Sequence, residues 1–146
     1  MKPYIPLLAI LFATAYYSNA YSQSSNDSSQ NDSIDKLLQQ RLDSAQNQTT
    51  YGMVECEAWA KDAYDKELNK YYKLLMKVLS PDEKEKLRVS ERNWINYRDS
   101  ESAFASALYG SMQGTMWGIV SVSADADVVR ARALEIKDYY KTITQQ

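Results

Sequence analysis

Three acidic residues in the middle of the 146-residue chain are the candidates for acid–base chemistry. Glu67 falls among the apolar positions of a helical pattern, and Asp65 and Glu101 are the carboxylates that could work with it. A pair of carboxylates in different environments is the equipment of a glycoside hydrolase. A charged residue on an apolar helix face is more often half of an ion pair, and no second catalytic motif accompanies these carboxylates. We therefore predict that the protein is not an enzyme.

Composition excludes several other kinds of chemistry. The chain has no histidine and a single cysteine, Cys56, so histidine-based metal sites, Ser-His-Asp or Cys-His catalysis and an intramolecular disulfide are ruled out. Its formal net charge is −2, whereas a nucleic-acid-binding protein needs a basic face. We expect no cofactor, no metal and no nucleic-acid partner, and we interpret Cys56 as a small buried apolar residue.

The first 32 residues predict export rather than folded structure. Residues 1–20 are typical of a secretory signal peptide, because Lys2 precedes an apolar core and Ser18-Asn19-Ala20 offers small residues for cleavage before Tyr21. Residues 21–32 are rich in serine and asparagine and are expected to form a disordered tether. The folded domain is then 33–146. We predict a periplasmic or extracellular location, with no membrane span after cleavage.

The remaining sequence is patterned for helices throughout. Apolar residues recur every three or four positions, and no segment alternates with the period of two that strands require. Ser80, Pro81 and Glu83 form a capping box with proline at the first helical position, which predicts a sharp helix start. We predict an all-α fold, a small antiparallel bundle of about four helices built around a long αα-hairpin. The expected helices cover residues 34–45, 51–79, 81–109 and 115–143.

Helix ends are predicted from single residues as well. Asp32 or Ser33 is the expected cap of the first helix, and Thr115 that of the last. Gly110 is the expected C-terminal stop of the third helix. Residues 121–127 are weakly patterned and could interrupt the fourth.

Charged residues on the apolar faces of the hairpin predict an ion pair between its arms. Glu67 lies about 14 residues before the turn and Arg98 about 17 after it, an offset of roughly one helical turn at about 1.5 Å per residue. Such a partly buried pair specifies helix register more than it adds stability. Trp94 lies on the apolar stripe of the third helix. We assign structural roles to Glu67, Asn69, Trp94, Tyr97, Arg98 and Asp99.

The connection from Tyr109 to Trp117 is the candidate partner-binding surface. It alone combines glycines, polar side chains and aromatic rings, since Ser111, Gln113 and Thr115 alternate with small or apolar residues. These three could imitate the hydroxyl and amide contacts of a sugar chain, while Tyr109 or Trp117 packs as an anchor. The alternative is that Trp117 belongs to the core and that the loop merely connects two helices.

Two sequence blocks give the chain a family resemblance. The blocks are Asp65-x-Glu67-Leu68-Asn69 and Trp94-Ile95-x-Tyr97-Arg98-Asp99, and with their surroundings they closely resemble the LprI-type lysozyme inhibitor family. The resemblance covers roughly residues 33–140. It implies a small exported bacterial helical protein, with lysozyme binding shown for some members. The family commonly has cysteines where this chain has Arg41, Ser102 and Ala124 or Ser123, so Cys56 lacks the partner that the resemblance would supply.

These observations favour a secreted binding protein of the bacterial cell envelope, with lysozyme as the partner that the resemblance implies. C-type lysozymes are strongly basic, and an acidic protein is compatible with attraction to them. An envelope interaction module with another partner is the second interpretation. A carboxylate-dependent hydrolase is the third.

Overall fold

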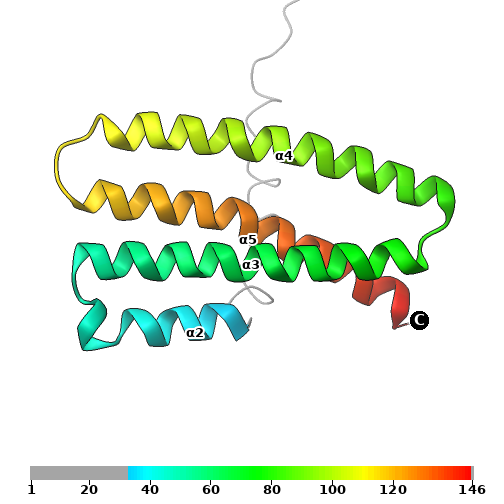
Figure 1. Ribbon diagram of the computed structural model, residues 1–146, viewed down its shortest axis with the longest axis horizontal. Helices are drawn as coiled ribbons and strands as arrows, with labels where there is room; N and C mark the ends of the chain where they lie inside the picture. The colour runs from blue at the N-terminus through cyan, green and yellow to red at the C-terminus, as the bar shows by residue number, and fades with distance from the viewer. Residues whose placement is uncertain (1–32, 146) are drawn as a thin grey trace, which may run out of the picture.

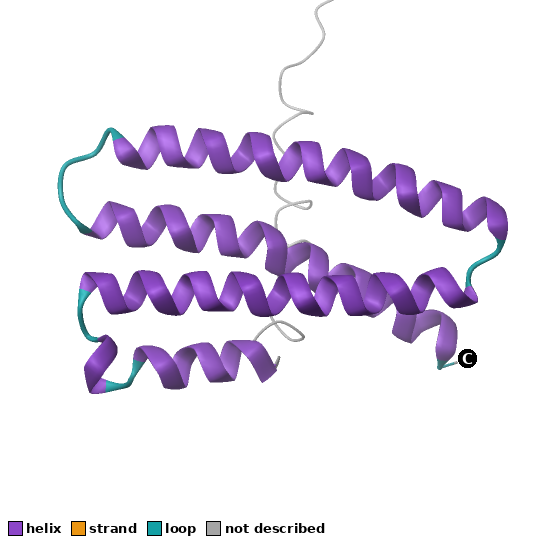
Figure 2. Ribbon diagram, viewed as in Figure 1, coloured by secondary structure: helices purple, strands orange, loops and turns teal. Residues whose placement is uncertain are grey.

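The computed structural model describes residues 33–145, and within that range every regular element is helical. The long helices are α3 (Thr50–Val78), α4 (Pro81–Gly110) and α5 (Met116–Thr144), and they follow the shorter α2 (Ser33–Leu42) and the 3-10 turn η1 (Ala45–Asn47). Figure 2 shows how short the connecting segments between them are. The all-α prediction is confirmed. The predicted signal peptide, the tether and the candidate cap Asp32 lie outside the described residues.

The four helices lie side by side, with α5 placed between the arms of the hairpin. At one end of the molecule the order across the bundle is α4, α5, α3 and α2, and toward the other end α5 crosses behind α3 (Figure 1). Helix α3 packs most extensively on α5, and α4 also packs on α5. The αα-hairpin is therefore present as α3 and α4, and α5 bridges its two arms.

The turn between α3 and α4 has the capping box that the sequence predicts. The Glu83 carboxylate accepts from the Ser80 backbone N–H at 2.8 Å, and the Ser80 hydroxyl accepts from the Glu83 backbone N–H at 3.5 Å. Pro81 occupies the first helical position. At the start of α3, the Thr49 hydroxyl accepts from the Gly52 N–H at 3.0 Å. Both long helices of the hairpin are thus started by side-chain caps.

The connection from α4 to α5 differs in detail from the prediction. Gly110 is the last residue of α4, but the glycine with left-handed backbone is Gly114, at φ +107°. Thr115 stands at the cap position of α5 in helical conformation, and its side chain makes no capping hydrogen bond. Residues 121–127 continue α5 without a break, because their tertiary contacts compensate for the weak pattern.

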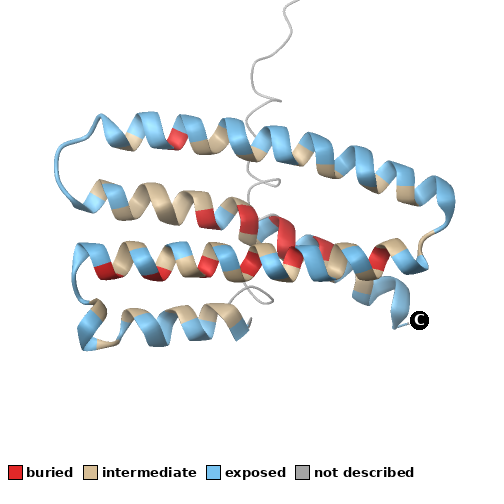
Figure 3. Cartoon of the chain, viewed as in Figure 1, coloured by how far each residue is buried: buried red, intermediate tan, exposed pale blue. Residues whose placement is uncertain are grey.

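The core lies between α3 and α5. Among described residues the most buried cluster takes Tyr64, Leu68 and Leu75 from α3 and Val129, Ala133 and Ile136 from α5. Figure 3 shows buried positions along α3 and in the middle of α5, whereas α4 is coloured as exposed or intermediate almost throughout. Cys56 is 2% exposed, as the apolar interpretation predicts. No helix in the described part of the chain combines the length and apolar character needed to span a bilayer.

Candidate functional site

The α4–α5 loop brings the five predicted partner-binding residues to one end of the bundle. The rings of Tyr109 and Trp117 stack across the base of the loop, with their centroids 5.9 Å apart and their planes at 9°. Both side chains are half-buried. They therefore pack on each other, and the stack closes the loop at its base instead of leaving either ring as a free anchor.

The polar residues of the loop are exposed. Ser111 donates from its hydroxyl to the Leu108 carbonyl at 2.7 Å, which fixes the last turn of α4. Gln113 and Thr115 are exposed, and the Thr115 hydroxyl lies 3.5 Å from that of Thr50 at the start of α3. The loop thus presents hydroxyl and amide groups above a stacked aromatic base.

Two exposed methionines enlarge this surface beyond the residues that we predicted from sequence. Met112 is 38% exposed and Met116 is 66% exposed. We call residues 109–117 the tip. The sequence does contain a signal for it, since residues 102–124 include no Asp, Glu, Lys or Arg in a chain that is 25% charged. Flexible thioether side chains on an uncharged surface suit contact with a protein partner.

The predicted ion pair between Glu67 and Arg98 is not among those that form. Glu67 forms an ion pair with Lys137 of α5 at 3.2 Å and lies 3.5 Å from Lys70 on its own helix. Arg98 pairs with its neighbour Asp99 at 2.7 Å. The prediction was wrong because it assumed that the two hairpin arms face each other directly, whereas α5 lies between them and supplies the cation for Glu67.

The other predicted structural residues lie around the same two helices. Asn69 donates to the Asp65 carbonyl at 2.8 Å. Trp94 is half-buried against the core, and the Arg98 guanidinium lies 5.3 Å from the centre of its ring. Tyr97 is 55% exposed and takes no part in the core.

A buried arginine that the prediction missed joins α4 to α5. Arg132 is 8% exposed, and its guanidinium donates to Glu91 at 2.5 Å, to Ser90 at 2.9 Å and to Glu135 at 2.6 Å. Hydrogen bonds to Glu135 and Glu91 raise the pKa of Arg132 against the opposing effect of burial. Glu91 does lie on the α4 stripe that includes Trp94, but no periodicity indicates which helix supplies its cation.

A second network joins α2 to the core helices. Asp35 of α2 accepts from Arg130 through both carboxylate oxygens, at 2.8 and 2.5 Å, and from the Tyr64 hydroxyl at 2.5 Å. Burial and the bond to Asp35 raise the pKa of Tyr64 well above its usual range. Helix α2 has no buried residue, so this network and partly buried contacts such as that of Ile34 hold it in place.

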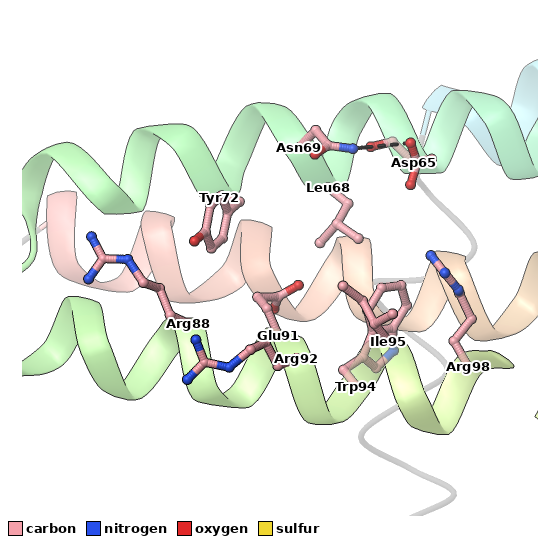
Figure 4. Close-up of a pocket in the computed structure, with 10 residues that line it drawn as sticks. All are labelled: Asp65, Leu68, Asn69, Tyr72, Arg88, Glu91, Arg92, Trp94, Ile95 and Arg98. Atoms are coloured by element: carbon pink, nitrogen blue, oxygen red, sulfur yellow. Dashed lines mark hydrogen bonds between the residues drawn. The ribbon is translucent and has the colours of Figure 1, made fainter. Parts of the chain in front are cut away.

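A groove of about 400 Å³ lies between α3 and α4 (Figure 4). Leu68, Tyr72 and Ile95 give it apolar walls, and α5 runs behind it. Arg88 and Arg92 on its rim both reach Glu85, at 3.1 and 3.5 Å, so these arginines form exposed ion pairs of small energetic value. The other lining residues are Asp65, Asn69, Glu91, Trp94 and Arg98.

The carboxylates that could do acid–base work are not arranged for it. Glu67 is held by lysines, and Asp65 accepts from Asn69. The carboxyl groups with raised pKa are instead Glu57 and Asp127, in both cases chiefly because of burial. Residues 33–145 contain no group of three or more side chains suited to holding a metal ion.

These features define an all-helical protein with a closed α3–α5 core, a groove beside it and an uncharged tip. The family model described as the lysozyme inhibitor LprI matches residues 41–136, a range that contains α3, α4, the tip and most of α5. The chain belongs to this family of lysozyme inhibitors.

A solved structure shares the fold. The crystal structure of an uncharacterized protein from Burkholderia thailandensis matches this chain with a TM-score of 0.73 at 28% sequence identity. The match covers 78% of this chain and 56% of the other, so this chain spans a little over half the length of that protein. No curated protein matched the chain.

Proposed function

We propose that the protein is an exported binding protein of the bacterial cell envelope that inhibits a lysozyme. The observation that carries the proposal is the family match over residues 41–136, because it includes α3, α4, the tip and most of α5. The predicted signal peptide at residues 1–20 supports export. The partner and the cellular location are parts of the proposal.

The tip is the surface that we assign to the partner. An inhibitor must place groups in the partner's cleft, and a short loop between rigid helices can do so without a large loss of chain entropy. Ser111, Gln113 and Thr115 provide exposed hydroxyl and amide groups of the kind that a sugar-binding cleft accepts. The stacked Tyr109 and Trp117 hold the base of the loop.

A loop substitution tests the binding surface. In the chain from Tyr21 onward, Ser111, Met112 and Gln113 are all replaced by alanine, and inhibition is measured as the rate at which a lysozyme clears a suspension of bacterial cell walls. We expect inhibition to weaken at least about tenfold, the loss typical of removing a hot-spot contact. In the matched control, alanine replaces Lys73 and Lys77, two exposed residues at the far end of α3. This control variant should inhibit like the parent.

The outcomes separate the proposals. If the folded loop variant, checked by circular dichroism, inhibits as well as the parent, the tip is not the binding surface. If the parent inhibits no lysozyme but is retained by another envelope protein, the interaction-module interpretation replaces lysozyme inhibition. Export is tested independently by sequencing the N-terminus of the periplasmic form, which should begin at Tyr21.

A further inference from the structure

A polar pocket of about 310 Å³ lies where the end of α2, the η1 turn and α3 meet. It shares no lining residue with the tip or with the groove of Figure 4. Its one aromatic side chain is that of Trp59, which is half-buried. Most of the other lining residues are polar: Leu37, Gln40, Arg41, Ser44, Gln46 and Asn47. An aromatic ring among amides and a hydroxyl suits a polar ligand that has one apolar face.

The polar side chains of the pocket are available to a ligand. Within residues 33–145, the side chains of Gln40, Ser44 and Gln46 make no hydrogen bond to another described residue. Both glutamines are exposed. A glutamine amide donates and accepts, so it can bind hydroxyl groups as well as other amides.

Arg41 is the charged group of the pocket. Its guanidinium lies 4.5 Å from the centre of the Trp59 ring. Each of the other arginines in residues 33–145 lies within ion-pair distance of a carboxylate, whereas Arg41 does not. A cation on an exposed ring is held weakly, so a ligand can take its place on the indole. The displaced guanidinium then remains beside the ligand, as a donor for a carboxylate.

The backbone around the pocket is fixed before any ligand binds. The Asn47 side-chain amide donates to the Arg41 carbonyl at 2.8 Å, and that of Gln48 donates to the Leu42 carbonyl at 2.7 Å. At Gly52 an added Cβ would lie 2.6 Å from the Asn47 Cα, so η1 lies directly against α3. A preformed site of this kind binds with a smaller loss of chain entropy.

We propose that this pocket binds a chain of pyranose sugars that carry carboxylates, the chemistry of a bacterial cell-wall glycan. One sugar ring stacks its C–H face on the Trp59 indole. Gln40 and Gln46 hydrogen-bond its hydroxyl or acetamido groups, and Arg41 pairs with a carboxylate. The choice of a cell-wall glycan rests on the proposed export, whereas the sugar chemistry rests on the pocket itself.

The position of the pocket gives this binding a use. The α2–α3 and α4–α5 connections lie at the same end of the bundle (Figure 1). The Thr50 hydroxyl at the start of α3 lies 3.5 Å from that of Thr115 in the tip. Trp59 is about 14 Å further along α3, at about 1.5 Å per residue. The glycan site thus holds the inhibitor on the polymer that a lysozyme cleaves, with the tip close by.

The test measures how much of the chain from Tyr21 onward sediments with purified bacterial peptidoglycan, with lysozyme absent. The parent should be retained, and general charge attraction does not explain retention because the chain is itself net negative. Trp59→Ala should weaken binding at least about tenfold. The matched control is Tyr97→Ala, which removes an aromatic ring that is 55% exposed on α4, and it should bind like the parent.

A second variant keeps the test decisive if Trp59→Ala does not fold. It replaces Gln40 and Gln46 together by alanine, and both are exposed side chains without a hydrogen bond to another described residue. Circular dichroism and the thermal midpoint should therefore match those of the parent. Binding to peptidoglycan should weaken severalfold.

Chitin separates the sugar rings from the carboxylate, since its rings carry acetamido groups and no carboxylate. Arg41→Gln should lower binding to peptidoglycan and leave binding to chitin unchanged. The double glutamine variant should lower binding to both polymers.

Three results would overturn the proposal: a parent that does not sediment with peptidoglycan, a folded double glutamine variant that binds like the parent, or an Arg41→Gln variant that binds peptidoglycan like the parent. Lysozyme inhibition is measured separately. The loop variant at Ser111, Met112 and Gln113 should retain glycan binding, so a failure of either proposal can be told from a failure of the other.

Discussion

Helices α3 and α4 are almost equal in length, 29 and 30 residues, yet they are used in different ways. Six residues of α3 are buried, and Ala105 is the single buried residue of α4. Helix α3 has α2 on one side and α5 on the other, while α4 rests on α5 alone among the helices with extensive contacts. A long helix can thus be stable with one face on the bundle while most of its surface stays exposed.

Small residues account for part of the difference. The first half of α3 places Gly52, Cys56 and Ala60 at buried positions, which lets neighbouring segments approach closely. A Cβ at Gly52 would lie 2.6 Å from the Asn47 Cα of η1, so this contact requires glycine. Helix α4 turns Leu87 and Trp94 toward the core instead, and such large side chains keep the helix axes further apart.

The largest expected effect compares one leucine from each helix. Leu75 of α3 is 2% exposed, and its replacement by alanine should lower the free energy of unfolding by about 3–4 kcal/mol through lost burial and a cavity. Leu108 of α4 is 39% exposed, and Leu108→Ala should change the free energy of unfolding by less than about 0.5 kcal/mol. Urea unfolding at low protein concentration measures both. Equal losses would contradict the contrast between the helices.

Local features of this fold could be predicted from sequence, and helix partners could not. Ser80, Pro81 and Glu83 fix the start of α4 because a capping box depends on four consecutive residues. Periodicity placed Glu67 on an apolar face, but it does not say which helix that face meets. The assumption that chain neighbours pair directly therefore gave Glu67 the wrong cation, Arg98 instead of Lys137.

The tip was predictable in part. Glycines and polar residues between two helical patterns located the loop, because turn chemistry is local. The stacking of Tyr109 on Trp117 depends on how α4 and α5 approach each other, which no local rule gives. The exposure of Met112 and Met116 was missed because apolar residues are assigned to the core by default, although the run without charge at 102–124 argued against it.

A pair of double-mutant cycles tests which charges join the helices. Glu91→Gln with Arg132→Met should show a coupling of about 1–2 kcal/mol, because Arg132 is buried and donates to Glu91 through two nitrogens. The control cycle, Glu67→Gln with Arg98→Met, should be additive within about 0.5 kcal/mol, since these residues have other partners. Coupling in the control and none in the first cycle would mean that α3 and α4 pack directly on each other.

The smallest expected effect concerns how stability depends on pH. The sign of this dependence should differ between one carboxylate of α3 and one carboxylate of α4. Burial raises the pKa of Glu57 on α3, with the nearby charge of Asp127 adding to it, whereas hydrogen bonds from Ser80 lower the pKa of Glu83 on α4. A raised folded pKa contributes stability below the ordinary value of 4.5 that is lost as pH rises through the folded pKa. A lowered folded pKa contributes stability above pH 4.5, and this stability is lost as pH falls through the folded pKa.

The corresponding glutamine variants should therefore diverge from the parent in opposite directions across this pH window. Relative to the parent, Glu57→Gln should gain stability as pH rises from about 4 to 7, by about a few tenths of a kcal/mol because the site is partly solvated. Glu83→Gln should lose stability over the same rise. Thermal unfolding of the parent and the two variants at several pH values measures both trends. If the two differences from the parent changed with pH in the same direction, the contrast between a partly buried carboxylate on α3 and a solvated cap on α4 would not hold.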